Sequence, residues 1–148
     1  MVSQGRRHSD YRFLSNIALA DIAYVARGDS LQSLFEAAAR ALTDVMVDRK
    51  TVVGRVERRI EVKSPTVDRL LYDFLTELIV MKDVDSLLFS EFEVEVSPDG
   101  RSLKAEVKGE AIDRERHSLR NDVKAVTMHM FGVRREGGLW KSTVVLDI

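Results

Sequence analysis

Two aspartates stand where a charge is costly. Asp21 lies between apolar neighbours in a segment rich in β-branched residues, and Asp147 follows three apolar residues near the end of the chain. Carboxylates in such segments are rarely buried unless they are paired or bind a metal. Either both mark strand ends that water reaches, or both converge with the terminal carboxylate of Ile148 on one cation. All-oxygen ligands favour Ca²⁺, Mg²⁺ or Mn²⁺ over zinc.

A lysine and a histidine form the second group of candidates. Lys124 interrupts residues 123–133, an expected strand with apolar residues on both faces. His117 lies in an expected loop before it, where contact with a partner and simple exposure are both open. His129 falls within the apolar segment, where a core or edge histidine is commoner than a ligand. Lys124 and His117 are therefore the functional candidates of this group.

Motifs of independent catalysis are absent from the sequence. It contains no Gly-x-Gly-x-x-Gly, no phosphate-binding loop of the Walker type and no Gly-x-Ser-x-Gly elbow. The histidines stand at positions 8, 117 and 129, which matches no metal-binding spacing. We therefore expect a protein that is not itself an enzyme.

Two helices are predicted from apolar residues that recur every three or four positions. Ser30 has the residue type of an N-cap, and Pro65 with Thr66 opens the second helix. The two apolar stripes consist of Leu31, Leu34, Phe35, Ala38, Leu42, Val45 and Met46, and of Val67, Leu70, Leu71, Phe74, Leu75, Leu78 and Ile79. Each stripe defines the helix face that should enter the core.

The remaining apolar segments predict strands at residues 17–26, 55–63, 91–96, 103–107, 122–133 and 140–148. The sequence Pro98-Asp99-Gly100 predicts a tight turn between two of them. Residues 122–133, apolar on both faces, should form a central strand. The order of the elements predicts an α+β fold, with two helices packed on one face of a mostly antiparallel sheet.

Size and composition indicate one domain. The chain has 148 residues, of which 45% are hydrophobic and 32% charged, and its net charge is −1. The absence of cysteine excludes disulfides and thiolate metal sites. Residues 1–10 are polar and predict a disordered tail that is neither a signal peptide nor an anchor, followed by a domain over residues 11–148. We expect a cytoplasmic protein with no membrane contact.

The order and spacing of several short motifs resemble the archease family. Residues 122–129 read Asp-Val-Lys-Ala-Val-Thr-Met-His, with His117 five positions earlier. The family signature is His-x4-Glu-Val-Lys-Ala-Val/Ile-Thr-Tyr-His. Asp21 lies within Ala-Asp-Ile, followed at the family's offsets by Gly28 and by Ser30-Leu31, and the chain ends in Val-Val-Leu-Asp-Ile. The resemblance covers nearly everything from residue 11 to residue 148.

That resemblance implies a metal-binding accessory protein of the GTP-dependent, tRNA-splicing RNA ligase. The metal ligands fall on Asp21, Asp147 and Ile148, and the functional lysine falls on Lys124. The ligase uses GTP and Mn²⁺, and the archease promotes its guanylylation and repeated turnover. For this chain we expect Ca²⁺, with Mg²⁺ or Mn²⁺ as alternatives, and contact with RNA only through the ligase.

Four positions depart from the family pattern. Ala18 and Leu19 replace a His-Thr pair near the presumed ion, Met128 replaces Tyr, and Asp122 replaces Glu. Without the His-Thr pair, the metal ligands lose neighbouring polar groups that would influence the affinity for the metal and the choice of metal. This loss keeps open a metal-free protein-interaction or chaperone-like module in RNA processing. A third hypothesis, a metal-dependent hydrolase, lacks a convincing general base in the sequence.

Overall fold

The computed structural model describes residues 8–14 and 21–148. The first half of the chain forms β1 (Ser9–Leu14), β2 (Asp21–Gly28), α1 (Leu31–Met46), the 3₁₀ turn η1 (Arg49–Thr51), β3 (Val56–Lys63) and α2 (Val67–Asp85). The second half forms β4 (Leu87–Val96), β5 (Ser102–Ala111), β6 (Ala125–Val126), β7 (Gly132–Glu136) and β8 (Leu139–Asp147).

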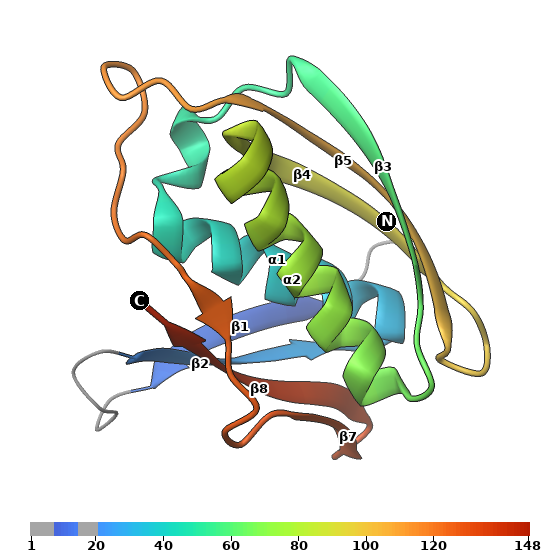
Figure 1. Cartoon of the computed structure of the whole chain (residues 1–148). Helices are drawn as coiled ribbons and strands as arrows, with labels where there is room; N and C mark the ends of the chain where they lie inside the picture. The colour runs from blue at the N-terminus through green and yellow to red at the C-terminus, as the bar shows by residue number, and fades with distance from the viewer. Residues whose placement is uncertain (1–7, 15–20) are drawn as a thin grey trace.

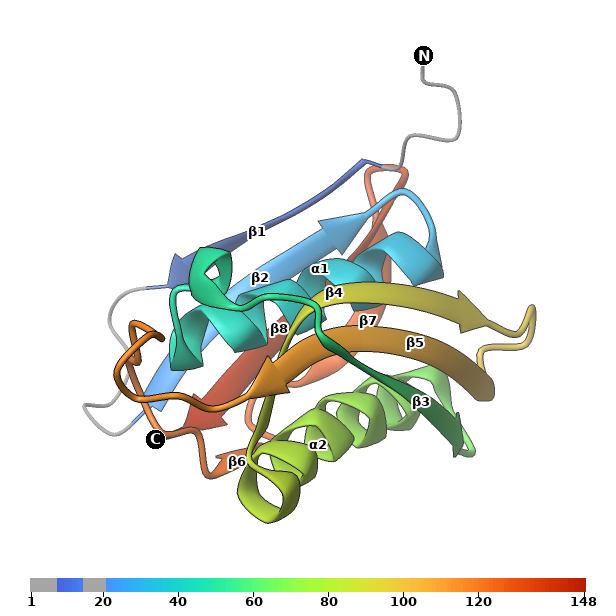
Figure 2. The same cartoon turned by 90° about the horizontal axis from the view of Figure 1, so that it is seen from above.

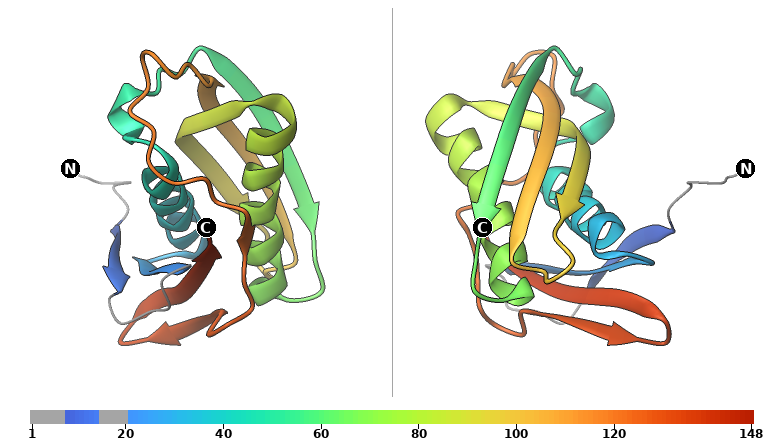
Figure 3. Two further views of the ribbon diagram at one scale, coloured as in Figure 1. Left: turned by 60° about the vertical axis from the view of Figure 1, so that its left-hand side comes forward. Right: turned by 90° about the vertical axis from the view of Figure 1, so that its right-hand side faces the viewer.

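The strands form two antiparallel sheets. The larger has the order β1-β2-β8-β6, with β7 also paired to β8, and the smaller has the order β3-β5-β4. Both helices lie between the sheets, α1 against β2 and β4 and α2 against β3, β4 and β6 (Figures 1 and 3). The predicted α+β class, two helices and antiparallel pairing are confirmed. The strands divide into two sheets, however, and the helices contact both of them.

Local capping fixes both helix starts where the sequence predicted them. The hydroxyl of Ser30 accepts a hydrogen bond from the main-chain N–H of Ser33, and the hydroxyl of Ser33 accepts one from the main-chain N–H of Ser30, which completes a capping box. Thr66 caps α2 in the same way by accepting from the N–H of Arg69. The two predicted apolar stripes meet in the core, where Phe35 of α1 stacks on Phe74 of α2 with 6.2 Å between ring centroids.

The predicted central strand at residues 122–133 is wrong. Ala125 and Val126 form β6, the chain then turns through Met130 at a φ of 56°, and Gly132 and Val133 already belong to β7. Val126 still enters the core, and Phe131 packs edge-on against Tyr72 of α2 at 5.7 Å. Because α2 buries these side chains, the segment needs no continuous strand to remove them from water.

The predicted N-terminal boundary also shifts. Ser9 and Asp10 pair with Gly28 and Arg27 as the start of β1, so the domain begins within the expected tail. Of the strand predicted from residue 17, the described part begins at Asp21; Ala18 and Leu19 lie outside the described residues. No helix in the described part of the chain has the length and apolar character needed to cross a membrane.

Candidate functional site

Asp21 and Asp147 are direct cross-strand neighbours. They open β2 and close β8 and face each other in the antiparallel register of the larger sheet. Directly opposite residues project from the same face of a sheet, with Cβ atoms about 5 Å apart. Both residues are half-buried. The fold therefore brings together two carboxylates that 126 positions separate in the sequence.

β6 completes the arrangement on the other side of β8. Ala125 is the register partner of Asp147, and the N–H of Lys124 donates to the carbonyl oxygen of Asp147 at 2.8 Å. Lys124 itself is exposed, and Ile148 follows Asp147 as a half-buried residue. Asp21, Asp147, Ile148 and Lys124, four of the five residues selected from the sequence, thus lie at one end of the larger sheet.

The carboxylates at this end of the larger sheet are ligands of the type that a hard cation prefers. Among the described residues, neither the side chain of Asp21 nor that of Asp147 has a hydrogen bond or ion pair, so both carboxylates can take a ligand. Two carboxylates 4 Å apart repel by about 4 kcal/mol at an effective dielectric of 20, and a divalent ion would relieve that cost. Ca²⁺ and Mg²⁺ accept carboxylate, carbonyl and water oxygens.

The donor set is nevertheless small. Over residues 8–14 and 21–148, no three side chains of His, Cys, Asp or Glu form a group that could hold a metal ion. Two side-chain carboxylates fit a metal only if main-chain or water oxygens supply the remaining ligands. The register pairing supports a cation site, and the small number of protein ligands argues for modest affinity.

A buried lysine anchors the segment that carries Lys124. The ammonium group of Lys82, near the end of α2, donates to Asp122 Oδ1 at 2.5 Å and to the carbonyl oxygen of Val123 at 2.7 Å. The Lys82 side chain is only 8% exposed. Because these bonds hold the two residues before Lys124, α2 fixes where Lys124 enters the sheet. The sequence analysis missed Lys82, whose only signal was a cation beside the buried stripe of the helix.

His117 lies in the expected loop before β6 but is not exposed there. Its side chain is fully buried, so contact with a partner through an exposed ring is excluded in this conformation. Nδ1 accepts from the N–H of Asp113 at 2.9 Å, so Nε2 carries the proton and donates to Glu110 Oε2, also at 2.9 Å. His117 therefore anchors the loop before β6. His129, predicted on a strand face, is exposed in the turn before β7.

Glu110 is the centre of this buried cluster. Besides His117, it accepts from both Nη atoms of Arg116 and from the N–H of Val53, and Arg55 lies 3.4 Å away. Hydrogen bonds from Arg116, opposed by burial and helped by His117, lower the pKa of Glu110 to about 2. A carboxylate with this many donors is fully occupied, so the cluster is structural and offers no ligand to a metal.

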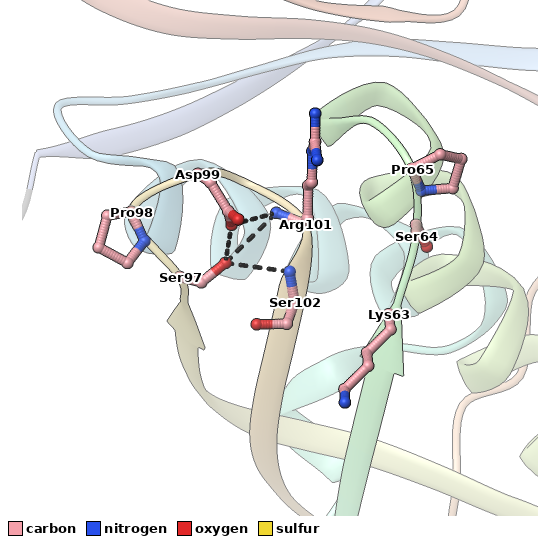
Figure 4. Close-up of a pocket in the computed structure, with 8 residues that line it drawn as sticks. All are labelled: Lys63, Ser64, Pro65, Ser97, Pro98, Asp99, Arg101 and Ser102. Atoms are coloured by element: carbon pink, nitrogen blue, oxygen red, sulfur yellow. Dashed lines mark hydrogen bonds between the residues drawn. The ribbon is translucent and has the colours of Figure 1, made fainter.

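A shallow hollow of about 630 Å³ lies at the opposite end of α2 from Lys82 (Figure 4). It is lined by Lys63, Ser64, Pro65, Ser97, Pro98, Asp99, Arg101 and Ser102. Its polar groups serve the turn itself, since Ser97 Oγ donates to Asp99 and accepts from the N–H of Ser102. None of the residues selected from the sequence lines it, and it carries no functional assignment.

A family model and several similar sequences place the chain in the same protein family. Residues 11–148 match the model of the archease protein family. The chain is 42% identical over 131 residues to protein archease of Methanothermobacter thermautotrophicus, covering 87% of this chain and 93% of that protein. It is 40% identical over 132 residues to protein archease of Pyrococcus abyssi, with the same coverage. Protein archease of Methanosarcina mazei is 36% identical over the full length of both chains.

Two solved structures share the fold. The solution structure of Methanobacterium thermoautotrophicum protein 1598 superposes with a TM-score of 0.81 at 40% identity and covers 93% of this chain and 98% of that one. The crystal structure of an archease from Thermotoga maritima, described as a possible chaperone, has a TM-score of 0.63 at 22% identity. It covers 88% of this chain and 93% of that one, and supports the fold alone.

Proposed function

The chain belongs to the archease family, and we propose that it acts as a metal-binding accessory protein of a GTP-dependent, tRNA-splicing RNA ligase. The observation that carries the proposal is the cross-strand pairing of Asp21 with Asp147 beside Lys124. At this end of the sheet the two carboxylates are cross-strand neighbours, and the main chain of Lys124 is hydrogen-bonded to Asp147.

Asp21 and Asp147 would hold the divalent ion, with Ile148 beside them. When bound, the ion would neutralise the carboxylate pair and present a positive centre to an oxyanion. Lys124 would contact a nucleotide, a phosphate or the ligase, because it is exposed while its main chain is tied to Asp147. Docked at the nucleotide site of the ligase, this end would promote guanylylation and reset the enzyme between cycles.

Calorimetry with CaCl₂, MgCl₂ and MnCl₂ tests the metal site directly. We expect heat of binding for at least one of the three salts and a large loss of affinity in Asp21→Asn and Asp147→Asn. Asp85→Asn provides a matched control, because Asp85 is an exposed aspartate at the end of α2. Equal binding by all four proteins would exclude the proposed ligands.

The ligase role needs a separate assay. The protein is titrated into the cognate ligase, and both guanylylation and product formed per ligase molecule are followed. We expect stimulation by the wild type, little by Asp21→Ala, and partial recovery of a Lys124→Ala defect in Lys124→Arg. No stimulation by the wild type would reject the partner, whereas full stimulation by Asp21→Ala would reject the role of the metal.

A second candidate function is a metal-free interaction or chaperone-like module in RNA processing. The small number of potential ligands among the described residues favours it. This function predicts no heat with any of the three salts and a ligase assay in which the aspartate variants act like the wild type.

A further inference from the structure

A second surface combines arginines with aromatic side chains along the free edge of the larger sheet. β1 is the edge strand, and α1 lies beside it (Figure 2). We propose that this surface, formed by Tyr11, Phe13, Arg40, Arg49 and Arg120 and called here the β1-edge patch, binds a short stretch of single-stranded nucleic acid. This inference is independent of the metal site, and it departs from the expectation that RNA is met only through the ligase.

Arg40 is the first observation. It lies on α1, is partly buried, and donates one hydrogen bond from Nη2 to Ser9 Oγ at 2.7 Å. No ion pair among the described residues includes Arg40. Burial, and then the neighbouring charge of Arg49, lower its pKa. The carboxylates of Glu36 and Asp44 oppose this shift. A guanidinium group carries five N–H donors, of which the hydrogen bond to Ser9 uses one.

Arg49 and Arg120 add positive charge around one carboxylate. Arg49 Nε lies 3.3 Å from Asp44 Oδ1, the Tyr11 hydroxyl donates to Asp44 Oδ2, and Arg120 Nη1 donates to the main-chain oxygen of Asp44 at 2.8 Å. Both carboxylate oxygens are therefore occupied. Arg49 contacts the Asp44 carboxylate, Arg120 contacts the main-chain oxygen of the same residue, and Arg40 acts on Asp44 only through its charge.

Phe13 supplies the feature that simple anion binding does not explain. It is 47% exposed, among the largest exposures of any described aromatic or aliphatic side chain, and it packs edge-on against Tyr11 at 5.9 Å and Tyr24 at 5.8 Å. These contacts hold the ring in place at the sheet edge. A rigid, exposed aromatic ring beside guanidinium groups is the arrangement that stacks a base and binds the adjoining phosphates. An acidic peptide would use the charges and leave Phe13 without a role.

Fluorescence anisotropy with labelled 10-nucleotide single strands tests the patch across a salt series. RNA and DNA of the same sequence form two arms, and a duplex and a poly-glutamate peptide form two more. We expect the wild type to bind the single strands with a log–log salt slope near −2, since each phosphate contact contributes about −0.7. Phe13→Ala should weaken binding about fivefold or more with little change in slope.

The arginine variants give the complementary result. Arg40→Gln and Arg49→Gln should each reduce the salt slope by about 0.7, and two positions are used in case one variant is unstable. Arg58→Gln on the smaller sheet is the matched control, because Arg58 is exposed and lies in β3. Circular dichroism melts establish that each variant is folded.

Three outcomes overturn the proposal. Absence of binding to either single strand at low salt rejects the patch altogether. Equal affinity for poly-glutamate together with an unchanged Phe13→Ala variant shows a simple anion surface. Loss of binding in Arg58→Gln equal to that in Arg40→Gln shows non-specific attraction to charge. A difference between the RNA and DNA arms identifies which sugar the surface prefers.

Discussion

The ammonium group of Lys82 lies 2.5 Å from Oδ1 of Asp122, although 40 residues separate them. The same ammonium group donates to the main-chain oxygen of Val123. One buried cation thus joins the end of α2 to the segment that leads through Lys124 into β6. The position of Lys124 depends on a residue that never touches the proposed ion.

Lys82→Met is expected to destabilise the protein by about 1–3 kcal/mol, because it leaves the buried carbonyl of Val123 without a donor. Asp122→Asn should cost less than about 1 kcal/mol, since the Asp122 side chain is 79% exposed and the pair is partly screened. Urea denaturation measures both. Equal losses in the two variants would show that the ion pair, and not the carbonyl contact, matters.

Glu110 predicts how stability responds to acid. Its folded-state pKa of about 2 is below the ordinary value of 4.5, chiefly because of Arg116. As the pH falls, Glu110 therefore takes up a proton in the unfolded chain before it does so in the folded chain. Its contribution to the free energy of unfolding is complete above pH 4.5 and is lost as the pH falls toward 2. Denaturation measured at several pH values should show a shallower acid dependence in Glu110→Gln than in the wild type. Identical slopes would contradict the assignment.

His117→Phe tests whether the histidine is structural. The change keeps an aromatic ring but leaves the N–H of Asp113 without its acceptor and removes one donor from Glu110. We expect a loss of about 1–3 kcal/mol in the free energy of unfolding. His129→Phe is the control, and because His129 is exposed the change should stay within about 0.5 kcal/mol. Wild-type stability with lost ligase stimulation would instead assign His117 a direct contact.

Asp21→Asn should have opposite effects with and without metal. Like charges directly across an antiparallel pair are destabilising, so neutralising one should raise stability in chelator by about 0.2–1 kcal/mol. The same variant should lose the rise in melting temperature that a bound divalent ion gives to the wild type. Thermal melts with and without chelator provide both numbers. A variant that is less stable than the wild type in chelator would show that the aspartates do not repel.

Much of the local structure follows from short-range chemistry that the sequence contains. Ser30 and Thr66 accept the first free N–H groups of their helices, and Gly100 adopts a φ of 72° in the turn that was predicted from Pro98-Asp99-Gly100. Each of these features depends on neighbours within a few residues. The apolar stripes likewise identified the buried helix faces, because helical periodicity fixes which side chains share a face.

The candidate site could be predicted from the sequence only in part. Asp21 and Asp147 stood out because a charge in an apolar strand is unusual, but their adjacency is a property of the register between β2 and β8. The burial of His117 and of Lys82 could not be predicted from the sequence, because it depends on hydrogen-bond partners that are distant in the chain.

The amino-acid sequence by itself determined the helices, their caps, the hairpin turn and the residue types available for chemistry. Tertiary structure alone decided that the strands divide into two sheets, that residues 127–131 turn along α2, and that His117 is buried. The physical reason is that apolar segments of ambiguous period adopt whichever conformation buries them against the rest of the chain. That surface exists only once distant segments have come together.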